Sequence, residues 1–193
     1  MSKTRRYKAV VIGSSAGGLN ALKVIFSQLE PKFGIPVIMV QHISPDAENY
    51  LIHILNALKN IPVKEADEKE MPVKGMAYVA PPNYHLLIEP DQTFTLTVDE
   101  RVNYARPSID VLFETAAEAY REGLIGIILT GANSDGSKGL KKIRDLGGLT
   151  IVEDPETAEV KSMPRAALHS TPADHVLPLE KIAPLLNSLV EDQ

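Results

Sequence analysis

The sequence predicts a three-layer α/β fold, in which helices cover both faces of a doubly wound, mostly parallel sheet with an antiparallel hairpin at one edge. Three short segments, at residues 9–12, 36–40 and 124–129, are almost uniformly apolar, which is typical of strands buried on both faces. Segments with apolar side chains at helical spacing separate them, and this alternation indicates a parallel sheet. The 193 residues suffice to bury a sizeable core, and we expect residues 1–193 to form a single domain.

The first third of the chain predicts a right-handed βαβ unit. After the strand at residues 9–12, residues 17–29 carry apolar side chains along one helical face, and Pro31 and Gly34 end that helix. The strand at residues 36–40 closes the unit. An amphipathic helix is expected to follow at residues 47–58.

The middle of the chain changes character. Residues 61–100 are short β-rich segments separated by proline and glycine, so we expect one or two parallel strands and an antiparallel hairpin. Pro107 and Ser108 then begin a helix, with Ser108 as its expected N-cap. The remaining strands and helices are expected at residues 124–129, 137–146, 149–152, 165–169, 175–177 and 179–190.

Composition and charge narrow the class of protein. Apolar residues make up 44% of the chain and charged residues 23%, as in ordinary globular proteins. The net charge is −5 without a block of like charge, so nucleic acid is not an expected partner. No apolar stretch approaches the roughly 18 residues that a membrane helix needs, and no apolar signal region follows the basic N-terminus. We therefore expect a cytoplasmic protein without membrane insertion.

A tight turn of small residues joins the first strand to its helix. Residues 13–17, Gly-Ser-Ser-Ala-Gly, fit the G-x-S-x-G pattern, which exposes a serine on a sharp strand-to-helix turn. Ser15 would be the nucleophile, and Ser14 would be a turn residue whose side chain projects away from it. Such turns also cradle phosphates or simply close a βα unit, so these five residues do not decide the chemistry alone.

Three strands end in polar loops, and the carboxyl ends of parallel strands share one edge of a sheet. These loops present Ser15, His42 and Asp135. A serine hydroxyl needs an imidazole to take its proton, and the imidazole needs a carboxylate to orient it. The backbone N–H groups of Ala16 and of the loop containing Ala132 are candidate donors to an oxyanion.

Other residues compete for the roles of acid and base. Asp110 and Asp154 are rival acids, the first inside a predicted helix and the second after a strand. His169 or His175 could formally act as a late base. However, the order serine, histidine, aspartate differs from the serine, acid, histidine order of ordinary α/β-hydrolases.

Further polar residues have both a structural and a functional interpretation. His85 either packs at the start of the hairpin or lines the cleft. Arg106 and Arg165 each either bind substrate or anchor neighbouring backbone. The spacing of His42, His53 and His85 is not that of metal ligands, and the absence of cysteine excludes thiolate sites, so we expect no metal and no other cofactor.

Six motifs lie at residues 12–18, 41–42, 80–81, 106–113, 129–136 and 163–165. Together they resemble the catalytic domain of CheB protein-glutamate methylesterases, in that family's order and spacing. The resemblance covers roughly residues 7–190. It implies hydrolysis of glutamate γ-methyl esters on the cytoplasmic domain of methyl-accepting chemoreceptors, as part of chemotaxis adaptation, and in some members deamidation of receptor glutamines. The family's serine, histidine and aspartate fall on Ser15, His42 and Asp135.

Two features depart from that family. Ala132 stands where members often have methionine, at a position whose backbone N–H is thought to serve the oxyanion. The amide survives this change, but a large side chain near the substrate is missing. In addition, the first predicted strand begins too close to residue 1 for the phosphorylatable receiver domain of CheB phosphorelay proteins, so we expect a stand-alone member or control by a separate regulatory protein.

Two other classes of function remain as alternatives. A nucleotide-binding α/β module would carry G-x-G-x-x-G and an acidic residue after the second strand. Here Ser15 replaces the second glycine, and His42 stands near the position of the acid. A non-catalytic receptor-binding domain would not need the serine, histidine and aspartate, all of which are intact.

Overall fold

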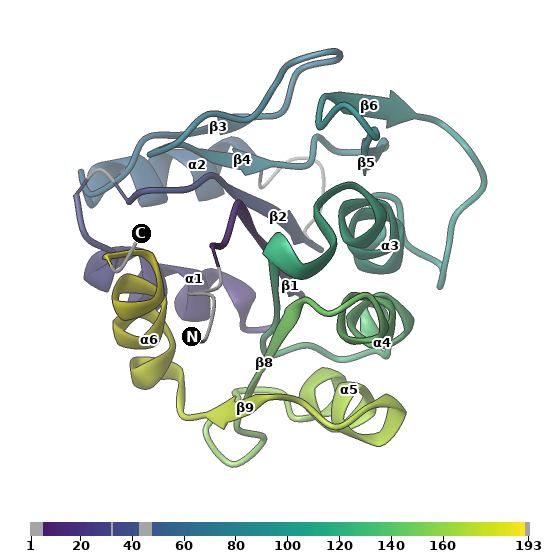
Figure 1. Ribbon diagram of the computed structural model, residues 1–193. Helices are drawn as coiled ribbons and strands as arrows, with labels where there is room; N and C mark the ends of the chain where they lie inside the picture. Colours follow the sequence, from purple (N-terminus) through teal and green to yellow (C-terminus); the bar gives the residue numbers. More distant parts are fainter. Residues whose placement is uncertain (1–5, 32, 43–47, 192–193) are drawn as a thin grey trace, which may run out of the picture.

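The computed structural model describes residues 6–31, 33–42 and 48–191 (Figure 1). Its centre is a seven-stranded parallel sheet with the order β3-β4-β2-β1-β7-β8-β9. The strands are β1 (Ala9–Ser14), β2 (Val37–Gln41), β3 (Val63–Glu65), β4 (Ala77–Val79), β7 (Leu124–Ile128), β8 (Leu149–Glu153) and β9 (His175–Leu177). Every residue of β1, β2, β7 and β8 is buried, as expected for strands covered on both faces.

Helices form a layer on each face of this sheet. Figure 1 shows α1 (Gly18–Gln28), α2 (Glu48–Ala57) and α6 (Leu179–Glu191) on one face. The helices α3 (Ile109–Tyr120), α4 (Ser137–Asp145) and α5 (Ser162–Ser170) cover the other, and a 3₁₀ turn, η2 (Arg121–Gly123), follows α3. Two hydrophobic cores, one on each side of the sheet, hold the three layers together. The predicted three-layer fold class is therefore confirmed.

The predicted hairpin is present as a sheet of its own. The strands β5 (His85–Ile88) and β6 (Phe94–Thr97) pair with each other in antiparallel register, and β5 packs against α3. Phe94 is fully buried and meets the Tyr78 ring edge-on at 5.1 Å between ring centroids. This apolar contact, together with main-chain hydrogen bonds between Phe94 and Lys69 and Glu70 in the segment that connects β3 to β4, joins the hairpin to the main sheet.

Most predicted elements lie within a few residues of their observed positions, and the start of α5 differs instructively. We expected this helix from residue 165, but it begins at Ser162 and includes Pro164 in its first turn. Proline is tolerated there because the first helical N–H groups have no intrahelical partner.

The strand order places the topological switch point at β1. From β1 the chain first moves to β2 on one side and later returns to β7 on the other. Ligands of open α/β sheets bind beyond the carboxyl ends of the strands at such a point. The loops after β1, β2 and β7 are therefore brought together in space although they are far apart in the sequence.

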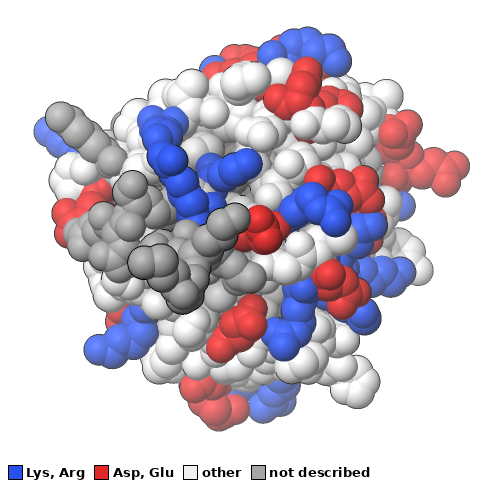
Figure 2. Space-filling view, in the orientation of Figure 1, with Lys and Arg blue, Asp and Glu red and all other residues white. Residues whose placement is uncertain are grey.

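The surface is mixed in charge. Figure 2 shows basic and acidic side chains of the described residues interspersed over one face of the molecule. Among the described residues, no helix combines the length and apolar character needed to span a membrane.

Candidate active site

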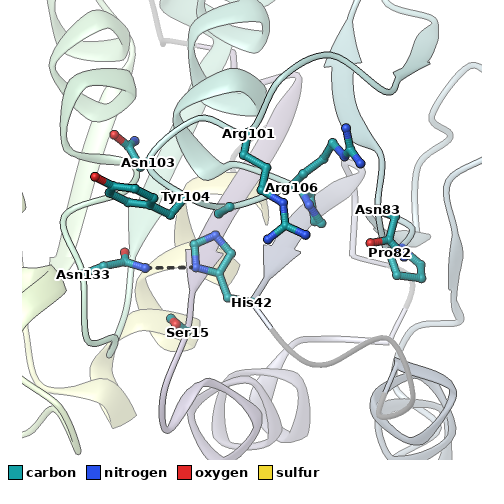
Figure 3. A pocket seen from close by; sticks show the side chains of 11 residues that line it. Ser15, His42, Pro82, Asn83, Arg101, Asn103, Tyr104, Arg106 and Asn133 are labelled. Atoms are coloured by element: carbon teal, nitrogen blue, oxygen red, sulfur yellow. Dashed lines mark hydrogen bonds between the residues drawn. The ribbon is translucent and has the colours of Figure 1, made fainter.

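A cavity of about 480 Å³ opens at the carboxyl ends of β1, β2 and β7 (Figure 3). Its floor comes from the loops that follow these strands, and its wall comes from the irregular segment between β6 and α3. The lining residues are Ser15, His42, Pro82, Asn83, Arg101, Asn103, Tyr104, Ala105, Arg106, Pro107 and Asn133.

The turn after β1 is built to expose Ser15. The Ser15 N–H donates to Thr130 O at 3.0 Å, and the Gly18 N–H donates back to Ser15 O at 2.8 Å. Gly17 has φ 80°, a left-handed conformation that favours glycine, and it is the N-cap residue of α1. Ser15 therefore lies on a sharp turn directly before a helix N-terminus.

Ser14 and Gln41 form a buried brace beneath this turn. Ser14 Oγ donates to Gln41 Oε1 at 2.6 Å, so its side chain is turned away from the cavity, as predicted. Gln41 Nε2 donates to Ser15 O at 2.8 Å and to His42 O at 3.0 Å. One amide thereby ties together the backbones of Ser15 and His42. Sequence reasoning missed this role, because nothing in the pattern distinguishes Gln41 from any other polar residue at a strand end.

His42 lies between the cavity and Asp135. Its Nε2 is 3.0 Å from Asp135 Oδ2, although the N–H bond does not point directly at that oxygen. Because an ionised carboxylate only accepts hydrogen bonds, this contact favours the tautomer with the proton on Nε2. The Nδ1 lone pair is then left facing the cavity, where Asn133 Nδ2 lies 3.4 Å from it (Figure 3).

Asp135 is fully buried at the N-terminus of α3. Its Oδ2 accepts the Ile109 N–H at 2.7 Å, and its Oδ1 accepts the Asp110 N–H at 3.1 Å and Ser108 Oγ at 2.9 Å. Asn103 Nδ2 donates to the same Oδ1 at 2.8 Å. The positive end of the helix dipole and these donors favour the ionised form of the carboxyl group.

The pKa of Asp135 reflects two opposing effects. Burial alone raises this pKa, but the close contact with His42 and the hydrogen bonds from Asn103 and the two helix N–H groups together lower it by more. The pKa therefore lies below the ordinary aspartate value, and the carboxylate is ionised at neutral pH.

Ser108 occupies the N-cap position of α3 as predicted, but its hydroxyl makes no capping bond to the helix. Instead the hydroxyl donates to Asp135, and the Asp135 carboxylate accepts the first helix N–H groups. The expected capping bond is therefore replaced by a carboxylate from the loop after β7. The physical reason is that a carboxylate offers these N–H groups a charged acceptor.

The structure brings Ser15 and His42 to one cavity and His42 to within hydrogen-bonding distance of Asp135. Ser15 Oγ forms no hydrogen bond with a described residue. The nitrogen of His42 that remains available to it is Nδ1, because Nε2 faces Asp135. The three side chains thus converge on the predicted edge of the sheet.

The two candidate oxyanion donors are sequence neighbours of residues that line the cavity: Ala16 follows Ser15, and Ala132 precedes Asn133. Neither alanine is itself among the lining residues. Ala16 and Ala132 are exposed, and neither amide N–H bonds to a described residue. The neighbouring amide of Gly131 differs, because it donates to Val160 O at 3.1 Å. The backbone N–H groups of Ala16 and Ala132 therefore have no hydrogen-bond acceptor among the described residues.

The predicted arginine, Arg106, lines the cavity wall, but its guanidinium is bound to backbone. Its Nη1 donates to Val98 O at 2.6 Å and to Asp99 O at 2.9 Å. This geometry corresponds to the anchoring alternative. The arginine that projects into the cavity is Arg101 (Figure 3), which sequence reasoning missed because its segment has no periodic pattern.

The rival acids have structural contacts of their own. Asp110 is buried, accepts the Gly139 N–H at 2.7 Å and is bonded by Asn103 Nδ2 at 2.8 Å. Burial raises its pKa. Asp154 accepts the N–H of Glu156 within its own turn. Neither carboxyl group lines the cavity.

The remaining candidates also lie outside the cavity lining. His85 is buried, with Nδ1 accepting the Ser108 N–H at 3.2 Å and Nε2 3.0 Å from Glu100 O, so it packs rather than lining the cleft. Arg165 lies 3.4 Å from Glu156. His169 belongs to α5 and His175 to the edge strand β9. Within the described part of the chain, no group of three or more His, Asp or Glu side chains could hold a metal ion.

The family follows from comparison with known proteins. The family model described as CheB methylesterase matches residues 10–186. The chain belongs to the CheB methylesterase family. The catalytic domain of the Thermotoga maritima CheB methylesterase, solved by crystallography, superposes with a TM-score of 0.92 at 38% identity, covering 95% of this chain and 99% of that one. The fold and the sequence resemblance described above therefore agree.

Curated relatives of this CheB family member differ in length. A relative from Leptospira interrogans is 60% identical over 179 residues, which cover 93% of both chains. The protein-glutamate methylesterase/protein-glutamine glutaminase of Thermotoga maritima is 38% identical over 186 residues, which cover 95% of this chain but 54% of that protein. The chain thus spans nearly all of one relative and about half of the other.

Proposed function

We propose that this chain is a serine hydrolase that removes γ-methyl esters from glutamate residues of bacterial chemoreceptors. The observation that carries the proposal is the convergence of Ser15, His42 and Asp135 at the switch point of a CheB-family fold. Relatives are named protein-glutamate methylesterase/protein-glutamine glutaminase. The substrate would be the cytoplasmic domain of a methyl-accepting chemoreceptor, so the enzyme would act in the cytoplasm during chemotaxis adaptation.

In the first half-reaction, Ser15 Oγ attacks the ester carbonyl while His42 Nδ1 takes the hydroxyl proton. For this step the Ser15 hydroxyl turns toward the imidazole and replaces Asn133 Nδ2 as the neighbour of His42 Nδ1. The N–H groups of Ala16 and Ala132 donate to the developing oxyanion. The intermediate collapses by breaking the bond to the methoxy group, and His42 returns its proton so that methanol leaves.

In the second half-reaction, water replaces methanol. His42 takes a proton from water, the hydroxide attacks the acyl-enzyme, and Ser15 leaves with the proton. The product is a glutamate carboxylic acid, which releases its proton to solvent at neutral pH, and the enzyme is regenerated. Asp135 keeps its charge throughout, orienting His42 through Nε2 and stabilising the imidazolium in both steps.

The same residues serve deamidation of glutamine. Ser15 again attacks the carbonyl carbon. His42 then gives its proton to the amide nitrogen, which leaves as ammonia in place of methanol. The remaining steps are identical. We therefore extend the proposal to protein-glutamine deamidation, in agreement with the second part of the relatives' name.

The test uses chemoreceptor cytoplasmic fragments carrying isotope-labelled methyl esters. Wild type is expected to release labelled methanol, and Ser15→Ala and His42→Ala are each expected to lower the rate by roughly 10³-fold or more. Ser14→Ala is the matched control, because it removes the adjacent hydroxyl but leaves the nucleophile, and we expect it to retain at least about a tenth of the rate. Undiminished methanol release by Ser15→Ala would contradict the proposal.

A second readout separates a catalytic from a non-catalytic domain. A serine-reactive fluorophosphonate is expected to label wild type at Ser15 and to leave Ser15→Ala unlabelled. Receptor binding without labelling of wild type would favour a receptor-binding role alone.

A further inference from the structure

The two arginines of the cavity wall differ in how their guanidinium groups are used. Arg106 is held by the carbonyl oxygens of Val98 and Asp99. Arg101 is exposed and projects into the cavity toward His42 (Figure 3). It forms no hydrogen bond or ion pair with a described residue, whereas Arg144 and Arg165 each lie within 4.0 Å of a carboxylate. Arg101 is therefore a cation that its described surroundings do not neutralise.

The described lining of the cavity is opposite in charge to the whole chain. The net charge of the protein is −5, yet the described residues that line the cavity include two arginines and no aspartate or glutamate. The nearby carboxylate of Asp135 is fully buried behind His42, and its oxygens are occupied by donors from α3. It forms no ion pair with Arg101, so the guanidinium of Arg101 faces the cavity without a carboxylate partner among the described residues.

The reacting ester offers Arg101 no charged partner, because a γ-methyl ester is neutral. In the proposed mechanism, the oxyanion that forms during the reaction is bound by the N–H groups of Ala16 and Ala132, which have no other described acceptor. A guanidinium presents a planar fork of N–H donors that matches a carboxylate. The feature that Arg101 is suited to recognise is thus a second, ionised side chain of the substrate.

We propose that Arg101 forms a specificity subsite for an aspartate or glutamate carboxylate that flanks the reacting ester on the substrate protein. This inference rests on the proposed function and names what the same site selects. A glutamate beside the reacting ester is bound while it is ionised and is no longer recognised once it is methylated or replaced by glutamine. The enzyme therefore acts faster on a methyl ester with an ionised neighbour than on one with a neutral neighbour.

The experiment is a positional scan with peptides that contain one glutamate γ-methyl ester. Each peptide carries a single glutamate, or a matched glutamine, at one position from −4 to +4, and kcat/KM is measured by methanol release. For wild type, glutamate at one or more positions is expected to raise kcat/KM about tenfold over glutamine. The preference is expected to decrease as ionic strength rises.

The variants assign this preference to one residue. In Arg101→Gln the glutamate-to-glutamine ratio is expected to fall to about one, and Arg101→Lys is expected to keep part of it. Arg121→Gln is the matched control, because it removes an exposed arginine in η2, before the amino end of β7, and it is expected to keep the wild-type ratio.

Three outcomes would overturn the inference. A wild-type ratio near one at every position would show that no carboxylate is recognised. A preference that survives in Arg101→Gln would assign the recognition to another residue. An equal loss on every peptide, neutral ones included, would place Arg101 at the reacting group instead. In all three cases the proposed function stands if wild type releases methanol and Ser15→Ala does not. If wild type releases no methanol, both proposals are overturned.

Discussion

The floor and the wall of the cavity differ in secondary structure, burial and hydrogen bonding. The floor consists of the ends of β1 and β2 and the loops that follow the strands, where Ser14, Gln41 and Asp135 are buried and hydrogen bonded. The wall is the segment of residues 98–107, whose tip is a tight turn closed by paired bonds between Val102 and Ala105. Such a difference is typical of proteins in which a rigid scaffold positions reactive groups and an exposed loop contacts the ligand, as we propose for these two regions.

The tip of the wall is linked to the floor by one side chain. Asn103 and Tyr104 form the turn with left-handed φ values of 51° and 63°, and Tyr104 is 95% exposed. Asn103 points inward and donates at 2.8 Å to both Asp110 and Asp135. One side chain of the turn therefore supports the acid of the floor, while its neighbour faces the solvent.

The largest expected loss of activity follows substitution of Asp135, the buried carboxylate of the floor. Asp135→Asn is expected to lower kcat by about 10³–10⁴-fold, because an asparagine amide favours the wrong tautomer of His42. The measurement is methanol release from methylated receptor fragments. Asp110→Asn is the matched control, since it makes the same chemical change in a neighbouring buried carboxylate that does not contact His42. If Asp110→Asn were as inactive as Asp135→Asn, the assignment of the acid would be wrong.

The second largest loss of activity is expected for Gln41, which forms the buried brace with Ser14. Gln41→Leu is expected to lower kcat by about 10–100-fold and the free energy of unfolding by about 1–3 kcal/mol. The Ser14 hydroxyl loses its acceptor, and the carbonyl groups of Ser15 and His42 lose their donor. Ester kinetics and urea denaturation measure the two quantities. Ser14→Ala breaks only one of these bonds and should have a smaller effect, so a larger loss in Ser14→Ala would contradict this account.

A pH series tests the electrostatics of the same floor. The pKa of Asp135 is lower in the folded state than the ordinary aspartate value of 3.8. Its ionised contacts therefore stabilise the fold above pH 3.8, and this contribution is lost as the pH falls through the lowered pKa. The stability difference between wild type and Asp135→Asn should narrow with acidification, as measured by urea denaturation. A gap that stays constant or widens would argue against an ionised Asp135.

The smallest effect is expected at the tip of the wall. Tyr104→Ala is expected to raise KM by about two- to fivefold, with kcat within about twofold and the free energy of unfolding within about 0.5 kcal/mol of wild type. The reason is that a side chain exposed to this extent packs on nothing in the free protein but adds apolar contact to a bound partner. Steady-state kinetics with receptor fragments measure the change, and a large loss of stability would show that Tyr104 has a structural role instead.

The sequence alone determined the layered fold and the three chemical groups. Apolar strands and helical spacing are local signals, and parallel strands must end at a common edge, so Ser15, His42 and Asp135 could be placed together from their positions after strands. The motifs around them also identified the family. None of these inferences required knowing which side chains touch.

Only the tertiary structure decided how these groups are held and what surrounds them. The contacts of Asp135 with the start of α3 and of Gln41 with Ser15 join residues separated by 25 or more positions, and no local pattern encodes them. The orientations of the Arg101 and Arg106 side chains (Figure 3) depend on the path of an irregular loop that has neither helical nor strand periodicity. Hydrogen bonds between distant segments depend on where one element ends beside another, and that position is a property of the packed chain.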